Sequence, residues 1–234
     1  MSEPLNPRGD DVNLRAAPQM REYEAITGRI AADARGPILD WGCGWGQMSD
    51  LLRKRGVDVH AFDFRPEVGA SGRRPLARFP HIEAYIETQD SVRLPYGDEE
   101  FDAVLSCGVL DHVADPDGSL EELRRVLRPG GLLFVYKLPN RFSYLEAIAR
   151  RTGMYYHGQE PDDRLYDRRS AEALLYSHGF FVGEFRRTNL LPLSLTGRLI
   201  ERTGDTIWAA NRALQRIPGV NLVATNLELV AARR

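Results

Sequence analysis

Short apolar runs alternate with stretches of helical periodicity along the first 136 residues of the chain. The apolar runs predict five strands, at residues 37–41, 57–62, 82–86, 101–106 and 132–136. A helical period at residues 16–35 places Tyr23, Ile26 and Ile30 on one face, and further helical periods stand between the strands. Because strands and helices alternate, we expect a doubly wound α/β fold with a mostly parallel sheet and helices on both faces.

The last hundred residues continue this pattern with a helix and two more strands. The helix is expected over residues 171–178, with Ser170 as its N-cap. The strands are expected at residues 180–187 and 227–232, which brings the total to seven. The sequence Arg-Pro-Gly-Gly at residues 128–131 predicts a turn before the fifth strand.

Length and composition indicate one globular domain. The chain has 234 residues, of which 43% are hydrophobic, enough for a substantial core. Its net charge of −2 lacks the basic excess that is typical of a nucleic-acid-binding protein. The two cysteines, Cys43 and Cys107, have neither the number of a disulfide framework nor the spacing of metal ligands. We therefore expect no metal site and a cytoplasmic location.

The first fifteen residues differ from the rest of the chain. They are polar, contain proline and glycine, and lack the apolar core of a signal peptide, so we expect residues 1–15 to be disordered. No stretch approaches the roughly 20 apolar residues that a membrane-spanning helix needs. Residues 16–234 are expected to form a single domain.

Residues 38–47, Ile-Leu-Asp-Trp-Gly-Cys-Gly-Trp-Gly-Gln, are the most informative segment. An apolar strand is followed by three alternating glycines and then by a helical pattern. Glycines at such a turn let the backbone approach a ligand closely, because no Cβ intervenes. In open parallel sheets, ligands bind beyond the carboxyl ends of the strands, where this turn is expected. The turn alone is weak evidence, since ordinary tight turns are also rich in glycine.

Three later segments strengthen the pattern. The second strand ends at Asp63, whose carboxylate can accept hydrogen bonds from both hydroxyls of a ribose. Residues 90–102 run Asp-Ser-Val-Arg-Leu-Pro-Tyr-Gly-Asp-Glu-Glu-Phe-Asp, and residues 127–132 run Leu-Arg-Pro-Gly-Gly-Leu. In this order and at this spacing, the four segments resemble the class I S-adenosylmethionine-dependent methyltransferases. The resemblance covers about residues 37–136.

The resemblance implies an S-adenosylmethionine cofactor, a Rossmann-like sheet whose last strand is antiparallel, and a set of contact residues. The residues it assigns to the methionine part are Asp40, Gly42, Cys43, Gly44 and Gly46. Those it assigns to the ribose and the adenine are Asp63, Phe64, Asp90, Ser91 and Leu94. It places Cys107 and Gly108, just past the fourth strand, beside the sulfonium. Residues 37–136 would then be the cofactor-binding core, and residues 137–234 would carry the acceptor side.

A nicotinamide-dependent dehydrogenase is the main alternative for a glycine-rich loop followed by an acid. In that class the third glycine stands three positions after the second. Here that position holds Gln47. The Leu-Pro-Tyr and Arg-Pro-Gly-Gly segments also have no place in the dehydrogenase pattern, so the sequence favours the methyl donor.

His112 is the candidate catalytic base, with Asp111 beside it, because the pair follows the fourth strand at the rim where an acceptor would lie. An imidazole can take a hydroxyl proton near neutral pH, and Asp111 would orient it or act alone. Packing or helix capping is the alternative role for His112. A base is optional, since alignment alone can supply roughly 7–11 kcal/mol of a transfer barrier.

Further candidates lie after the fifth strand. The segment 137–143, Lys-Leu-Pro-Asn-Arg-Phe-Ser, is similar to one in methyltransferases of glycan, quinone and lipid pathways, which favours a hydroxylated, lipid-linked acceptor. Tyr155, Tyr156 and His157 either line the acceptor pocket or pack within a loop. Asp162-Asp163 is expected to be solvated loop charge rather than a metal site.

About forty residues, 188–226, separate the last two strands, too many for a simple hairpin loop. Within them, residues 198–217 have a helical period. Its basic arc contains Arg198, Arg202, Arg212 and Arg216. Two interpretations stand: a peripheral contact with an anionic membrane, or a surface helix packed over the sheet edge.

The sequence therefore predicts an S-adenosylmethionine-dependent methyltransferase that acts on a small-molecule or lipid-linked acceptor, at a hydroxyl oxygen. Methylation at nitrogen or carbon is the first alternative. A non-catalytic regulatory partner that binds the cofactor is the second. No Asp/Asn-Pro-Pro-aromatic motif is present, which counts against a nucleic-acid substrate. The oligomeric state stays open.

Overall fold

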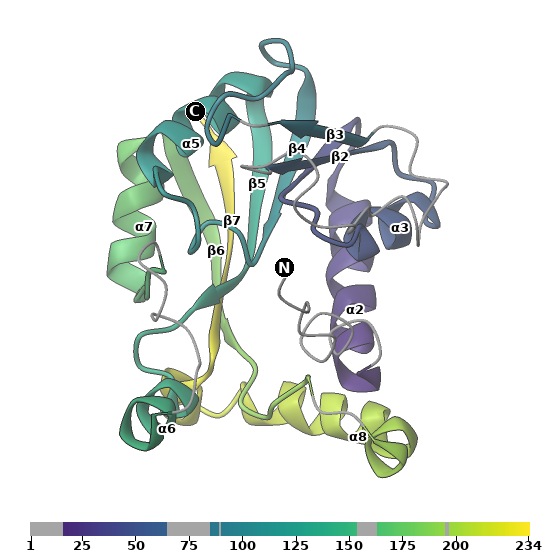
Figure 1. The fold of residues 1–234 in the computed structure, drawn as a ribbon, viewed down its shortest axis with the longest axis vertical. Helices are drawn as coiled ribbons and strands as arrows, with labels where there is room; N and C mark the ends of the chain where they lie inside the picture. Colours follow the sequence, from purple (N-terminus) through teal and green to yellow (C-terminus); the bar gives the residue numbers. More distant parts are fainter. Residues whose placement is uncertain (1–15, 65–84, 89, 154–162, 195–196) are drawn as a thin grey trace, which may run out of the picture.

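A computed structural model describes residues 16–64, 85–88, 90–153, 163–194 and 197–234 (Figure 1). Its centre is a seven-stranded sheet of order β3-β2-β1-β4-β5-β7-β6. The strands are β1 Ile38–Trp41, β2 Val59–Phe64, β3 Tyr85–Thr88, β4 Phe101–Cys107, β5 Leu127–Pro139, β6 Phe180–Thr188 and β7 Asn226–Arg233. The first five strands pair in parallel, and β7 runs antiparallel to both of its neighbours. The predicted fold class is confirmed.

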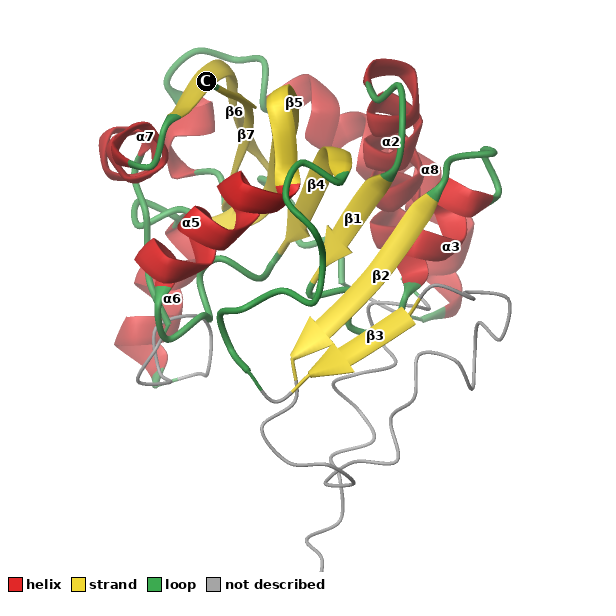
Figure 2. Cartoon of the chain, turned by 90° about the horizontal axis from the view of Figure 1, so that it is seen from above, coloured by secondary structure: helices red, strands yellow, loops and turns green. Residues whose placement is uncertain are grey.

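Helices cover both faces of the sheet. They are α2 Ala17–Asp33, α3 Gln47–Arg53, α5 Pro116–Val126, α6 Tyr144–Thr152, α7 Arg168–Ser177 and α8 Arg198–Leu214, with a 3-10 turn, η1 Val220–Val223. In Figure 2, α5 lies on one face and α2 and α3 lie on the other. Consecutive residues of β4 serve the two cores: Val104 packs with Leu120 of α5, and Leu105 packs with Ile30 of α2.

The topology fixes where a ligand can bind. β1 pairs with β2 on one side and with β4 on the other, so the order of the strands reverses at β1. Ligands of open α/β sheets bind in the crevice at such a switch point, beyond the carboxyl ends of the strands. The glycine-rich turn after β1 lies at this edge.

The insertion between the last two strands begins and ends close to residues 188 and 226, as the sequence predicts. β6 and β7 stay paired as far as Thr188 and Asn226, and α8 lies in the segment between them. α8 packs along α2, where Trp208 Nε1 donates to Glu22 Oε2 over 3.0 Å and a Cβ on Gly204 would lie 2.7 Å from that of Ala17. This is surface-helix packing, although α8 covers α2 rather than the sheet edge. No helix in the described ranges is long and apolar enough to cross a membrane.

Two local predictions were wrong. The N-cap of α7 is Asp167, which accepts from the Ser170 backbone while Ser170 Oγ accepts from the Asp167 backbone, so Ser170 is the third residue of a capping box. Residues 128–131 form no turn before β5. Pairing with β4 begins at Leu127 and resumes at Leu132, so these four residues bulge out within the strand.

Candidate active site

Two adjoining cavities, of about 290 and 280 Å³, lie at the carboxyl ends of the parallel strands. The first, the β2 cavity, is lined by Trp41, Gly42, Phe62, Asp63, Phe64, Ser91, Gly108, Val109, His112, Val113 and Ala114. The second, the β5 cavity, is lined by Gln19, Gly108, Asp111, His112, Lys137, Leu145, Asn189, Leu191, Pro192, Leu193, Ser194, Thr225 and Asn226. Gly108 and His112 line both cavities, so the two meet at the end of β4.

The glycine-rich turn has the backbone that only glycine adopts easily. Gly42, Gly44 and Gly46 have φ angles of 71°, 55° and 79°. A Cβ on Gly42 would lie 2.5 Å from the side chain of Val109, which follows β4, whereas a Cβ on Gly44 would meet open space. The turn therefore packs tightly against the end of β4 and leaves its outer backbone accessible to a ligand.

Asp40 supplies a buried carboxylate directly before this turn. It is 2% exposed, and Ser49 Oγ of α3 donates to its Oδ2 over 2.5 Å. Burial raises the pKa of Asp40 to about 6, and the charge of Asp63 acts in the same direction. Because a cation would restore the charge balance, Asp40 is a suitable partner for the ammonium group of an amino acid.

The end of β2 forms the opposite wall of the β2 cavity. Asp63 and Phe64 lie within the strand, one residue further than the sequence predicts, and both line the cavity. Phe64 is 38% exposed and offers an aromatic face. Asp90 instead holds its own loop, since its Oδ1 accepts from the Val92 and Arg93 backbones, and these bonds lower the pKa of Asp90.

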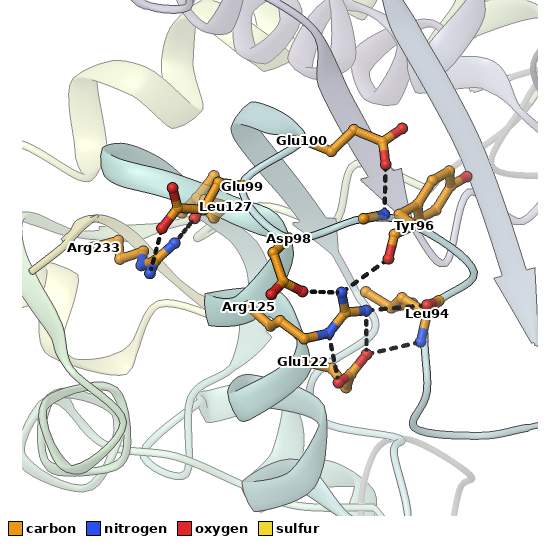
Figure 3. Close-up of polar contacts among 10 residues, drawn as sticks. Leu94, Tyr96, Asp98, Glu99, Glu100, Glu122, Arg125, Leu127 and Arg233 are labelled. Carbon is orange, nitrogen blue, oxygen red and sulfur yellow. Dashed lines mark hydrogen bonds and ion pairs between the residues drawn. The ribbon is translucent and has the colours of Figure 1, made fainter.

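Side chains of α5 bind the backbone of the Leu-Pro-Tyr segment, residues 94–96 (Figure 3). Arg125 donates to the Leu94 and Tyr96 carbonyls over 3.1 and 2.9 Å. Glu122 accepts from the Leu94 backbone over 3.0 Å and pairs with Arg125. Leu94 is 3% exposed and belongs to the core. The segment therefore supports the cavity rather than lining it, and Arg125 and Glu122 are structural residues that the sequence did not single out.

The predicted cofactor residues fall into two groups. Those that line the β2 cavity are Gly42, Asp63, Phe64, Ser91 and Gly108. Those outside the described lining are Asp40, Cys43, Gly44, Gly46, Asp90, Leu94 and Cys107. Cys43 is buried and its backbone donates to the Phe62 carbonyl, and burial raises the pKa of Cys107 to about 12, so that thiol stays neutral.

His112 lies between two carboxylates. Its Nδ1 is 2.6 Å from Asp163 Oδ1, and its Nε2 is 3.1 Å from Asp111 Oδ2. Burial raises the pKa of Asp111 to about 6, and Asp111 Oδ1 has no hydrogen-bond partner in the described part of the chain. Arg164 fixes the loop, because its backbone donates to the Asp111 carbonyl over 2.9 Å. His112 and Asp111, which both line the β5 cavity, could therefore exchange a proton with a ligand bound there.

Asp163 corrects the prediction of a solvated charge, since its side chain is only 3% exposed and faces His112. The two residues are 51 positions apart, and no local pattern links them. Asp162 and the candidates Tyr155, Tyr156 and His157 lie outside the described residues.

The geometry fits S-adenosylmethionine. The carboxylate of Asp40 could pair with the ammonium group of the cofactor. Asp63, at the end of β2, could bind the ribose diol, and the exposed ring of Phe64 could contact the adenine. The glycine-rich turn leaves room for a ligand beside Gly44, where a Cβ would meet open space. Gly108, which lines both cavities, contributes no side chain at their junction, where His112 is the other shared residue.

Comparisons with known proteins agree. The methyltransferase domain model matches residues 39–135. The chain is 38% identical over 111 residues to a demethylmenaquinone methyltransferase of Clavibacter sepedonicus, covering 47% of this chain and 44% of that protein. It is 32% identical over 136 residues to a ubiquinone biosynthesis O-methyltransferase of Xylella fastidiosa, covering 56% and 52%. The chain thus spans about half the length of the curated relatives it matches.

The fold is also found in solved structures. One is Burkholderia thailandensis 1,6-didemethyltoxoflavin-N1-methyltransferase with bound 1,6-didemethyltoxoflavin and S-adenosylhomocysteine, at a TM-score of 0.59 and 18% identity over 96% of this chain and 82% of that one. At this identity the likeness concerns the fold alone. The matched domain, the sheet order and the ordered motifs together show that residues 39–135 form a methyltransferase domain like that of the class I S-adenosylmethionine-dependent methyltransferases.

Proposed function

We propose that this protein transfers a methyl group from S-adenosylmethionine to a hydroxyl oxygen of a small-molecule or lipid-linked acceptor. The observation that carries the proposal is the meeting of the two cavities at Gly108 and His112. One cavity has the groups that a methyl donor needs, and the other has a polar wall that suits an acceptor. The sulfonium of the donor supplies the electrophilic methyl group, and the protein supplies alignment and a dry site.

Asp40, Asp63 and Phe64 would hold the ammonium, the ribose and the adenine of the cofactor. The Gly42–Gly46 turn would face its methionine part, and Gly108 would leave the methyl group accessible. Ser91, which lines the β2 cavity, would donate to the adenine edge. Asp90 would act indirectly, because its carboxylate shapes the loop that carries Ser91.

His112, Asp111 and Asp163 would handle the proton of the acceptor hydroxyl. With Asp163 accepting from Nδ1–H, Nε2 would be the basic nitrogen of His112. Because Nε2 lies 3.1 Å from Asp111 Oδ2, a proton could pass between these two groups. The hydroxyl proton would pass to this imidazole–carboxylate pair as the oxygen attacks the methyl group. A base with a pKa near neutrality is effective in this role.

Two kinds of relative support an acceptor of this class. One is named for ubiquinone biosynthesis O-methylation and another for demethylmenaquinone methylation. Since the chain spans about half of each, the acceptor and the acceptor atom are proposals here. The β5 cavity, at about 280 Å³, would hold only the reacting part of a larger molecule.

Calorimetry with S-adenosylhomocysteine tests the cofactor assignment, and Asp63→Ala should weaken binding sharply without unfolding the chain. Incubation of a metabolite and lipid extract with S-adenosylmethionine carrying an isotopically labelled methyl group then tests the reaction. A product labelled at oxygen supports the proposal, whereas a label on nitrogen or carbon supports the first alternative. Tight cofactor binding with no labelled product in any extract would favour a non-catalytic partner.

A further inference from the structure

Lys137 places a half-buried cation in the wall of the β5 cavity. It stands near the carboxyl end of β5, within its last three residues, and its φ of 57° is left-handed, which is unusual for a residue with a side chain. Its Nζ donates to the Tyr23 hydroxyl over 3.0 Å and lies 4.5 Å from the centre of that ring. Lys137 therefore has a left-handed backbone conformation, and its side chain contacts Tyr23 and lines the cavity.

This ammonium has no carboxylate partner within 4 Å in the described ranges. Glu22 is near enough to raise the pKa of Lys137, yet its Oε2 accepts from Trp208. Burial lowers the pKa of Lys137, but the Tyr23, Cys107 and Glu22 groups outweigh it, so the lysine keeps its charge. A partly desolvated charge is costly when no carboxylate of the described residues pairs with it directly, and the Lys137 ammonium borders a cavity that an anion could occupy.

Gln19 adds a second donor from another element. It lies on α2, is 4% exposed and lines the same cavity. Its Nε2 is buried and has no hydrogen-bond partner among the described residues. Buried donors are nearly always paired, so an unpaired one at a cavity wall indicates a missing acceptor.

We propose that Lys137 and Gln19 bind an anionic oxygen group, a carboxylate, of the methyl acceptor in the β5 cavity. The inference rests on the proposed function and specifies its substrate class. The acceptor is assigned as the source because much of the remaining wall comes from the segment between β6 and β7, through residues such as Asn189 and Ser194, and from Asn226 of β7. The other available carboxylate is that of the cofactor itself, which the experiment distinguishes.

The chain offers a simple probe, because Lys54 and Lys137 are its only lysines. Lys54 has a 64% exposed side chain and pairs with Asp50, far from the cavity wall. Protein labelled with ¹³C,¹⁵N-lysine therefore gives two side-chain signals, and Lys54→Met assigns them. The signals are followed by NMR while acetate, benzoate and hydroxybenzoates, or their methyl esters, are added to the complex with S-adenosylhomocysteine.

We expect the carboxylates to shift the Lys137 signal saturably, the esters to leave it unchanged, and Lys54 not to respond. Because a charge-assisted hydrogen bond is lost, Lys137→Met should weaken carboxylate binding about tenfold or more, with Gln19→Leu weakening it less. Lys137→Arg should retain part of the affinity, and Lys54→Met should retain all of it. Thermal melting of each variant shows whether it is folded.

Absence of a saturable Lys137 response to every carboxylate would overturn the inference. A Lys137 shift on adding S-adenosylhomocysteine alone, together with weaker binding of that ligand by Lys137→Met, would assign the site to the cofactor and also overturn it. Failure of the proposed function gives different results: calorimetry detects no binding of S-adenosylhomocysteine to the wild-type protein, or the extracts yield no product labelled at oxygen.

Discussion

Asp40 is a buried carboxylate, and we expect a bound ammonium group to stabilise its charged form. Since its pKa is raised to about 6 by burial, lowering the pH through 6 protonates it and removes the charge that would attract an ammonium. S-Adenosylhomocysteine keeps its ammonium in this range, so affinity should be full above the pKa and fall below it. Calorimetry from pH 7.5 to pH 5 should show about a tenfold loss by pH 5.

Asp40→Asn is the control for this pH dependence. The neutral amide should bind the ligand weakly at every pH and show no step near pH 6. An equally flat profile in the wild-type protein would mean that Asp40 does not carry the ammonium.

Substitutions at His112 and Asp163 should affect the rate of methyl transfer but not the binding of the cofactor. His112→Ala should lower kcat about 100-fold, within the range for loss of a general base, and leave S-adenosylhomocysteine affinity within twofold. Asp163→Asn should lower kcat less and shift the pH profile, because an amide can donate to Nδ1 and reverse the tautomer. Asp58→Asn, at an exposed position, should change neither. Full kcat in His112→Ala would contradict the base assignment.

Local patterns identified five cofactor candidates that line the β2 cavity. Of the β5 cavity they identified Gly108, Asp111 and His112, but not Gln19 or the individual residues of the insertion. Gly42 and Asp63 stand at strand ends, where chain order alone places them near a ligand. Asp163, Lys137 and Gln19 acquire their roles only in space, since each meets a partner from another part of the chain. Asp163 also shows that an acid in a polar loop can be buried once a histidine faces it.

At the scale of elements, Asn211 of α8 joins the insertion to the rest of the fold. It is 2% exposed, and its Oδ1 accepts from the Leu190 and Leu191 backbones over 2.7 and 3.1 Å. Its Nδ2 donates to Asn189 Oδ1 over 3.3 Å. This one side chain therefore shapes the segment that forms a wall of the β5 cavity.

Asn211→Leu should destabilise the protein by about 1–3 kcal/mol, because two buried N–H groups lose their acceptor. At roughly 2–4 °C per kcal/mol for a chain of this size, the melting temperature should fall measurably. Thr206→Leu, at an exposed position of the same helix, is the control. Equal melting temperatures for Asn211→Leu and the wild-type protein would show that the insertion does not depend on this contact.

Elements with strong local signals were predicted closely. The strands predicted at residues 101–106 and 180–187 are β4 Phe101–Cys107 and β6 Phe180–Thr188 in the structure. Helix α6 was not predicted, although Ser143 caps it and Gly153 ends it. The bulge at 128–131 was missed since its Pro-Gly-Gly composition is also that of a turn.

In the whole molecule, a single sheet edge brings the two halves of the chain together. Residues 16–136 supply most of the β2 cavity, and the segments after β5 supply most of the β5 cavity. The first part is the one that the family match covers, from residue 39 to residue 135. The second part lies outside that match, and its sequence predicts its elements but not what it recognises.

Ligand binding at this edge should stabilise the whole chain, because it ties β1, β2 and β4 to the loops that follow them. At 100 times its Kd, a ligand that binds only the folded state adds about 2.7 kcal/mol. For a chain of this length, that corresponds to a rise in melting temperature of roughly 5–11 °C. Scanning fluorimetry with S-adenosylhomocysteine should show this rise in the wild-type protein and in Lys137→Met. Asp63→Ala should show little of it at the same ligand concentration, since its affinity is reduced. A full shift in Asp63→Ala would place the nucleoside elsewhere than at the end of β2.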